Sequence, residues 1–201
     1  IGLASSFRPE LAGRMAEETR LQLMAIGARQ GLSPVLDIGV DPRWGRIEET
    51  FGEDPTLVSH FGTAYIKGLQ SDDLSTGVIA TGKHFIGHSL SRGGLNCAPV
   101  QIGLRDIYET FLPPFQAAIR DAKIASIMNS YPEIDGDVVA ASPRFLTHIV
   151  REELGFDGLL VSDYEAIIML HSFHFVADSA RKAAVLALKA GIEVEVPTTV
   201  C

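Results

Sequence analysis

The feature that most constrains the fold of this chain is a regular order of short apolar runs and helix-like segments. The apolar runs are continuous rather than alternating, which is typical of strands buried on both faces of a parallel sheet. Helices between them would cover those faces, so the pattern predicts an α/β domain. The predicted strands span residues 34–38, 78–85, 125–131, 158–163 and 192–197, and the predicted helices span residues 9–30, 55–69, 104–122, 143–154 and 181–190.

Proline residues support these helix boundaries. Pro9 suits a first helical turn, and in the pairs Asp54–Pro55 and Ser142–Pro143 a capping side chain precedes a proline at the first helical position. Gly31 ends the first helix. We expect Pro113–Pro114 to kink or split the third helix, because proline lacks the amide hydrogen that an inner turn needs.

The number of strands predicts a particular α/β fold. Strands that alternate with helices in this way fit a (β/α)8 TIM-type barrel, which typically needs about 250 residues. The chain has 201 residues, so we expect residues 1–201 to form one partial barrel domain that is truncated at both ends. No G-x-G-x-x-G motif follows the first predicted strand, so a dinucleotide-binding fold has no fingerprint here.

Charge and hydropathy narrow the range of partners. The net charge is −8, and lysine and arginine are scattered rather than clustered, which argues against a nucleic-acid surface. No apolar run approaches the roughly 18 residues that a membrane helix needs, so no membrane partner is expected. The sequence leaves a periplasmic, secreted or cytoplasmic location open.

Polar side chains stand where the apolar runs end. In a parallel barrel the carboxyl ends of the strands point to one face, where the chemistry takes place. Burying an unpaired charge is costly, and its repetition at successive strand ends predicts a polar pocket on that face. The residues concerned are Asp37, Lys83, His84, Asn129, Tyr131, Ser162 and Asp163.

Each of these residues also has a purely structural interpretation. Asp163 could cap a loop or the following helix. Lys83 could be an ion-pair partner, and His84 could be a hydrogen-bonded core residue. It is their shared position at one end of the strands that favours a functional site.

The charged loop at residues 41–53 adds a second feature of that face. It holds the only tryptophan, Trp44, between Arg43 and Arg46. Arginine donates to hydroxyls and carboxylates in a fixed geometry, and flat rings pack on sugar faces, so the loop suits sugar recognition. The acidic residues nearby, Glu49 among them, are interpreted as a solvated loop and helix start.

Five segments, in order and with matching spacing, resemble the motifs of glycoside hydrolase family 3, and the resemblance covers essentially the whole chain. The family consists mainly of β-glucosidases, β-xylosidases and β-N-acetylglucosaminidases, and the last group resembles this chain least. The segments are Asp41-Pro42-Arg43-Trp44-Gly45-Arg46 with Glu49-Thr50-Phe51-Gly52-Glu53-Asp54-Pro55, Lys83-His84-Phe85, Met128-Asn129-Ser130-Tyr131, Asp157-Gly158 and Val161-Ser162-Asp163-Tyr164.

The resemblance implies a retaining mechanism with a covalent glycosyl-enzyme intermediate, in which Asp163 attacks the anomeric carbon. A retaining glycosidase needs one carboxylate as nucleophile and one acid/base group. Trp44 is implied either to contact the sugar or only to support its loop. The residues implied to bind the sugar or to flank the nucleophile are Arg46, Lys83, His84, Tyr131 and Trp44.

The resemblance also implies the partners of the chain. The substrate would be a small carbohydrate, such as a β-glucoside or an oligosaccharide, and no metal or organic cofactor is expected. In this family the acid/base usually comes from a second, α/β sandwich domain, which this chain lacks and which we expect in the parent protein. We therefore expect the isolated chain to be poorly active.

Other functions remain open at this stage. A lysine at the end of a barrel strand is also what a Schiff-base lyase or aldolase uses, with Lys83 as the candidate. An inactive sugar-binding homologue is a second alternative. A metal-dependent hydrolase that uses His84, His88 and Asp163 is a third.

Overall fold

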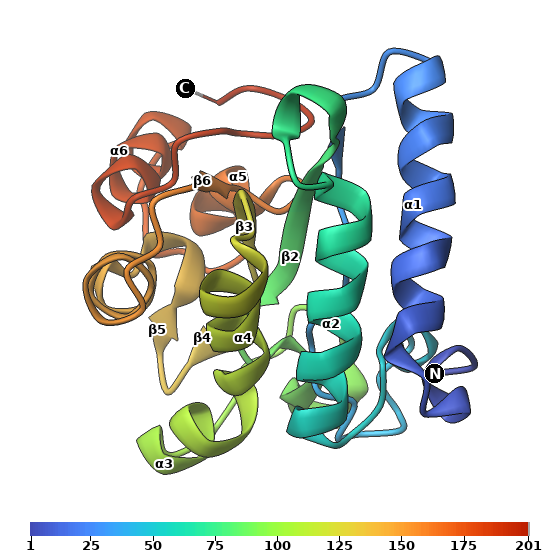
Figure 1. Cartoon of the computed structure of the whole chain (residues 1–201). Coiled ribbons are helices and arrows are strands. Elements are labelled where there is room, and N and C mark those ends of the chain that lie inside the picture. The colour runs from blue at the N-terminus through green and yellow to red at the C-terminus, as the bar shows by residue number, and fades with distance from the viewer. Residues whose placement is uncertain (201) are drawn as a thin grey trace.

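The computed structural model describes residues 1–200, which form an α/β fold around a parallel sheet (Figure 1). Four strands lie side by side in the order in which they occur along the chain, and all their pairings are parallel. Two further short strands form an antiparallel hairpin. The sheet consists of β1 (Gln30–Gly31), β2 (Ile79–Phe85), β3 (Ser126–Asn129) and β6 (Leu159–Val161), and the hairpin of β4 (Glu133–Ile134) and β5 (Asp137–Val138).

The outer predicted strands are present as single bridges. Val35 pairs with Lys83 and Val194 pairs with Val161, both in parallel. The predicted strands 34–38 and 192–197 therefore occupy the expected places beside β2 and β6. Regular pairing near residue 34 is limited because Pro34 has no amide hydrogen to donate. The sequence pattern does not predict β1, because it lies in the stretch that continues the first predicted helix.

Helices α1, α2 and α4 pack side by side against one side of the strands (Figure 1). Their apolar side chains and those of the strands form one hydrophobic core. The side of the sheet that the helices cover is therefore the outer wall of the fold. The helices are α1 (Pro9–Ala25), α2 (Pro55–Gln70), α3 (Leu104–Asp106), α4 (Pro113–Ala122), α5 (Ala166–Ser172) and α6 (Ala180–Ala190).

Most helix boundaries agree with the predicted capping signals. Asp54 caps α2 by accepting a hydrogen bond from the Leu57 amide at 2.7 Å, and the prolines at 113–114 separate α4 from the helical turns before it. The first helix is shorter than predicted and ends at Ala25. Gly27, with a φ of 81°, takes the left-handed backbone conformation that commonly stops a helix.

Three short elements differ from the predicted pattern. Residues Arg144–Glu153 follow Ser142 as predicted but wind as a π-helix. Helix α5 and the β4–β5 hairpin are not predicted at all. Helix α5 has seven residues, and isolated elements this short are marginal without tertiary packing. Local periodicity therefore carries little signal for them.

The topology confirms the predicted α/β class and places the site. Parallel strands in sequential order, with helices along their outer side, form the wall of a barrel. Within residues 1–200 no strand pairing closes this wall into a ring. The predicted domain boundary at Cys201 lies outside the described residues. None of the described helices combines the length and apolar character that crossing a membrane requires.

Candidate active site

The carboxyl ends of β2, β3 and β6 surround a cavity of about 320 Å³. Lys83 and His84 come from β2, Tyr131 follows β3, and Asp163 follows β6. Arg46 reaches the same cavity from the loop at residues 41–53. The cavity therefore brings together every predicted site residue except Trp44. Its lining residues are Leu32, Arg46, Lys83, His84, Met128, Tyr131, Asp163 and Tyr164.

Asp163 is held on one side and free on the other. Its backbone amide donates to Asn129 Oδ1 at 3.2 Å, and its Oδ1 accepts a hydrogen bond from the Tyr164 amide at 2.7 Å. Its Oδ2 is buried and has no hydrogen-bond partner among the described residues. A buried polar atom without a partner is rare. Asp163 Oδ2 is therefore the atom of this cavity that most needs a ligand.

Two consecutive residues of β2 line the cavity, although side chains alternate between the two faces of a regular strand. The register of β2 against β3 shifts between Gly82 and Phe85. Such an irregularity changes the direction in which side chains point. It accounts for Lys83 and His84 facing the same cavity.

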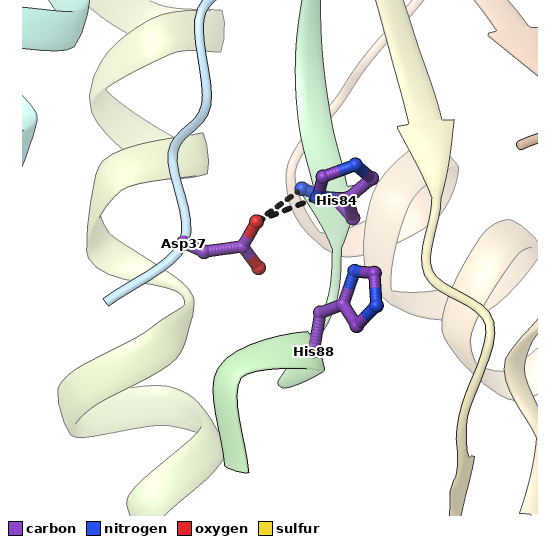
Figure 2. Close-up of side chains that lie close together, drawn as sticks. All are labelled: Asp37, His84 and His88. Carbon is purple, nitrogen blue, oxygen red and sulfur yellow. Dashed lines mark hydrogen bonds and ion pairs between the residues drawn. The ribbon is translucent and has the colours of Figure 1, made fainter. Parts of the chain in front are cut away.

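Asp37, which does not line the cavity, holds His84 (Figure 2). Asp37 Oδ2 accepts a hydrogen bond from the His84 backbone amide at 3.0 Å and lies 2.7 Å from His84 Nδ1. The other ring nitrogen, Nε2, lies 3.6 Å from Asp163 Oδ2. Burial raises the pKa of Asp37 to about 6 and lowers the pKa of His84 to about 3, because both charged forms lose hydration.

Two cations border the cavity. Burial and the nearby Arg46 guanidinium lower the pKa of Lys83, and Asp163 acts in the opposite direction. Arg46 donates through Nε and Nη2 to the Glu49 carboxylate at 2.8 and 2.9 Å. This contact raises the pKa of Arg46 and lowers that of Glu49, so both side chains stay charged. Glu49 is exposed, as expected for a solvated loop, and it also pairs with Arg46.

Tyr131 lies beside the nucleophile candidate. Burial and the nearby Asp163 carboxylate raise the pKa of the Tyr131 phenol. The phenol therefore keeps its hydrogen at neutral pH. It is available as a donor to Asp163 or to a ligand oxygen in the cavity.

Trp44 does not line the cavity. Its side chain is packed inside the loop with only 1% of the residue exposed. Its Nε1–H donates to Asn96 Oδ1 at 3.1 Å, and its ring centroid lies 5.2 Å from that of His88. Of the two roles considered for Trp44, this packing supports the role of holding the loop that carries Arg46.

Asp37, His84 and His88 are a group within residues 1–200 that could together hold a metal ion (Figure 2). One ligand atom from each lies within 4.8 Å of the others, and all three residues are buried. However, Asp37 and His84 are already joined by their hydrogen bond, and His88 Nε2 lies 2.8 Å from the backbone oxygen of Asn96. We therefore describe Asp37 and His84 as a hydrogen-bonded pair beside His88, whose Nδ1 has no hydrogen-bond partner among the described residues.

A larger groove of about 660 Å³ lies between α2 and α4 on the outer wall. Helix residues such as Ser59, Lys67 and Gln116 line it. None of the strand ends contributes to it. Four of the polar residues at the strand ends, Lys83, His84, Tyr131 and Asp163, meet at the smaller cavity, which is therefore the candidate active site.

Three residues of the site have roles that the sequence pattern does not assign. Asn129 orients the backbone of Asp163, Asp37 holds His84, and Glu49 holds Arg46. The three-residue spacing of Arg46 and Glu49 within one short helical loop is a local signal of their pairing. No local signal pairs Asp37 with His84, because 47 residues separate them.

Comparison with known proteins yields matches over the whole chain. The family model described as "Glycosyl hydrolase family 3 N terminal domain" matches residues 1–201. The chain is 40% identical, over 97% of its length, to a β-xylosidase of Formosa agariphila. It is 38% identical, over 96% of its length, to the lysosomal β-glucosidase of Dictyostelium discoideum.

Solved structures also match this chain over nearly its whole length. A β-glucosidase from Listeria innocua in complex with glucose has a TM-score of 0.94 and 34% sequence identity over 98% of this chain. The chain covers 28% of that structure, 28% of the Formosa relative and 24% of the Dictyostelium relative. It thus spans about a quarter of the length of the proteins that it matches.

Proposed function

Because this chain belongs to glycoside hydrolase family 3, we propose that it forms the barrel part of a retaining enzyme that removes terminal, non-reducing β-D-glucosyl or β-D-xylosyl residues. One observation carries the proposal. Asp163 lines the cavity together with several donors, and its Oδ2 lacks a hydrogen-bond partner among the described residues. A sugar that presents its anomeric carbon to this oxygen and its hydroxyls to the donors would complete the site.

The reaction proceeds through two displacements at one carbon. Asp163 Oδ2 attacks the anomeric carbon, the bond to the leaving oxygen breaks, and that oxygen takes a proton from an acid. The sugar is then an ester of Asp163. Water, after giving a proton to the conjugate base of that acid, attacks the same carbon and releases Asp163 as a carboxylate. Two inversions retain the β configuration.

The remaining cavity residues fit the binding of a sugar. Lys83 and Arg46 can donate hydrogen bonds to hydroxyls, and Tyr131 keeps a phenol hydrogen. His84 also lines the cavity. Contacts to hydroxyls that strengthen as the ring gains positive charge stabilise the transition state more than the substrate. No step of this scheme requires a metal or an organic cofactor.

A retaining glycosidase also needs a second carboxyl about 5–5.5 Å from the nucleophile. Among the described residues that line the cavity, Asp163 alone is acidic. We infer that residues 1–201 act as part of a larger enzyme, in which a second, α/β sandwich domain supplies the acid/base. The short span of this chain relative to the proteins it matches supports this inference.

The names of the relatives do not separate glucose from xylose as the preferred sugar. They include a β-xylosidase and a β-glucosidase, and the Listeria innocua β-glucosidase was solved with glucose and, as a mutant, with laminaribiose. Both sugars therefore stay within the proposal.

The first test uses the full-length protein that contains this chain. Asp163→Ala is expected to lower kcat on 4-nitrophenyl β-D-glucoside and β-D-xyloside by roughly 10⁴-fold or more, because the variant has no nucleophile. Asp157→Asn is the matched control. Asp157 is exposed and lies at the opposite end of β6, so this variant should keep wild-type activity.

Covalent labelling identifies the residue that reacts. A 2-deoxy-2-fluoro glycoside with a good leaving group should leave its sugar on Asp163, which peptide mapping by mass spectrometry detects. A label on another residue, or unimpaired hydrolysis by Asp163→Ala, would contradict the proposal. Borohydride reduction with a carbonyl substrate is expected to leave Lys83 unmodified, which separates this mechanism from that of a Schiff-base lyase.

A further inference from the structure

The two ring nitrogens of His84 face different carboxylates, so their hydrogens can be inferred from geometry. Asp37 Oδ2 accepts the His84 backbone N–H at 3.0 Å and lies 2.7 Å from His84 Nδ1. Two donors that converge on one oxygen make that oxygen an acceptor in both contacts. The hydrogen of the second contact therefore belongs to Nδ1.

The contact on the other side of the ring indicates that Nε2 carries no hydrogen. His84 Nε2 lies 3.6 Å from Asp163 Oδ2, which is too long for a hydrogen bond. An N–H at Nε2 would draw an ionised carboxylate to about 2.7–2.9 Å. The observed gap instead fits two acceptor atoms that face each other, and Asp163 Oδ2 has no other partner within the described chain.

The surroundings favour a neutral ring with one hydrogen. The side chain of His84 is 1% exposed, and burial is the largest cause that lowers its pKa to about 3. The cations beside the cavity act in the same direction and the carboxylates in the opposite one. The charged and titratable groups around the ring are Asp37, Arg46, Glu49, Lys83, His88 and Asp163.

We propose that Asp37 is a positioning residue, which fixes His84 in the tautomer with hydrogen on Nδ1 so that Nε2 accepts a hydrogen bond from a hydroxyl of the bound sugar. A sugar hydroxyl beside the ring would supply the hydrogen that Nε2 lacks and would leave Asp163 Oδ2 free to meet the anomeric carbon. Its oxygen would remain free to accept from Lys83. The role in sugar binding rests on the proposed function, whereas the tautomer does not.

Two substitutions of Asp37 distinguish the effect of its acceptor oxygen from the effect of its side-chain shape. Asp37→Asn can place its amide oxygen where both donors converge, because the opposite orientation would set an NH2 group against the backbone N–H. This variant should keep the hydrogen on Nδ1. Asp37→Leu has a similar shape but no acceptor. An Nδ1–H would then be buried without a partner, so the hydrogen should move to Nε2, where Asp163 accepts it.

Solid-state ¹⁵N NMR of the full-length protein, labelled at histidine, reads the tautomer directly, because protonated and unprotonated ring nitrogens resonate far apart. The His84 signals are those that disappear in His84→Gln. We expect Nδ1–H in the wild type and in Asp37→Asn, and Nε2–H in Asp37→Leu. Asp72→Leu, an exposed change from aspartate to leucine outside the cavity, should match the wild type.

Kinetics on the 4-nitrophenyl glycosides complete the test. Asp37→Leu should lose about 10- to 100-fold in kcat/KM, as expected when a group that orients a binding residue is removed. Asp37→Asn should stay within about 5-fold of the wild type, because it weakens the contact by loss of charge only. Both unfolding midpoints are measured alongside, so that a loss of activity is not mistaken for unfolding.

Several results would overturn the inference. They are an Nε2–H in the wild type, an unchanged tautomer in a folded Asp37→Leu, and a switched tautomer with unchanged kcat/KM. A stoichiometric transition metal on Asp37, His84 and His88 would overturn it too, because it would displace the Nδ1 hydrogen. If Asp37→Leu does not fold, the Asp37→Asn variant provides the test, and an Nε2–H in that variant would overturn the inference. An Nδ1–H in a wild type that hydrolyses no glycoside overturns only the proposed function.

Discussion

At the residue scale, side chains that line the cavity are oriented by carboxylates that lie outside it. Glu49 accepts hydrogen bonds from Nε and Nη2 of Arg46, and Asp37 binds His84. These carboxylates do not line the cavity. Asp163 is therefore the acidic group that a ligand meets there among the described residues, while Arg46 and His84 are pre-oriented to receive it. Pre-orientation reduces the entropy that binding must remove.

The ion pair of Arg46 and Glu49 leads to a prediction about substrate binding. Glu49→Gln in the full-length protein should raise KM for the glycoside and lower kcat/KM by about 5-fold, because the guanidinium would lose its fixed direction. The effect is limited to about 1 kcal/mol, because the pair is partly exposed and solvent screens it. Side-chain exposure is 26% for Arg46 and 38% for Glu49.

Steady-state kinetics check this prediction, with Glu48→Gln as the control. Glu48 is the adjacent residue in the same loop, is exposed and does not line the cavity. Its amide variant removes the same charge but leaves Arg46 paired. Equal kinetic losses in the two variants would show that net charge, and not the direction of Arg46, is responsible.

At the scale of the elements, the helices of the outer wall set the position of the strands and so of the cavity. Helices α1 and α2 cross closely at Gly68, where an added methyl group would overlap with the carbonyl oxygen of Gly13 and lie 3.1 Å from Ala16 Cβ. No side chain therefore fits between the two helices at this point. Close packing of this kind transmits a local change to the neighbouring elements.

This crossing predicts a measurable loss of stability. Gly68→Ala must force α1 and α2 apart, and such overpacking costs about 1–3 kcal/mol. For a domain of this size that corresponds to a fall in Tm of roughly 2–12 °C. Thermal unfolding measures it. Gly103→Ala is the control, because the added methyl group would have only Asp106 Oδ2 near it, at an uncrowded 4.0 Å, beside an exposed helix start. An equal fall in Tm for both variants would contradict the explanation.

At the scale of the whole molecule, the site is assembled from segments that are far apart along the chain. The cavity draws on residues 32–46, on β2, and on the loops after β3 and β6. These parts meet only because consecutive strands pair in parallel and leave their carboxyl ends on one side. The acid/base of the proposed mechanism is not among the lining residues described here.

The proposed mechanism places the nucleophile in this chain and the acid/base in a second domain. This arrangement predicts how the 201-residue chain behaves on its own. A general acid typically contributes 10²–10⁴-fold to such reactions. We therefore expect the isolated chain to hydrolyse 4-nitrophenyl β-D-glucoside at least about 100-fold more slowly than the full-length protein. Turnover numbers measured side by side decide the question, with circular dichroism to establish that the isolated chain is folded. Equal turnover by the two proteins would place the acid/base within residues 1–201.

The sequence by itself determined the α/β class, the order of the strands and the family, and each of these is confirmed. It did so because strand and helix periodicity, the Asp54 cap and the prolines act over a few residues and are visible locally. The same local rules failed for α5 and the β4–β5 hairpin, which are too short to form without tertiary contacts.

The tertiary structure alone decided how the site is held. It placed Asp37 against His84, and it placed Trp44 against Asn96 rather than in the cavity. These outcomes depend on strand pairing and packing between residues that are distant along the chain, such as Asp37 and His84, which are 47 positions apart. Residue types and spacing indicate which groups can react, whereas only packed neighbours determine which nitrogen carries a hydrogen and which oxygen stays free.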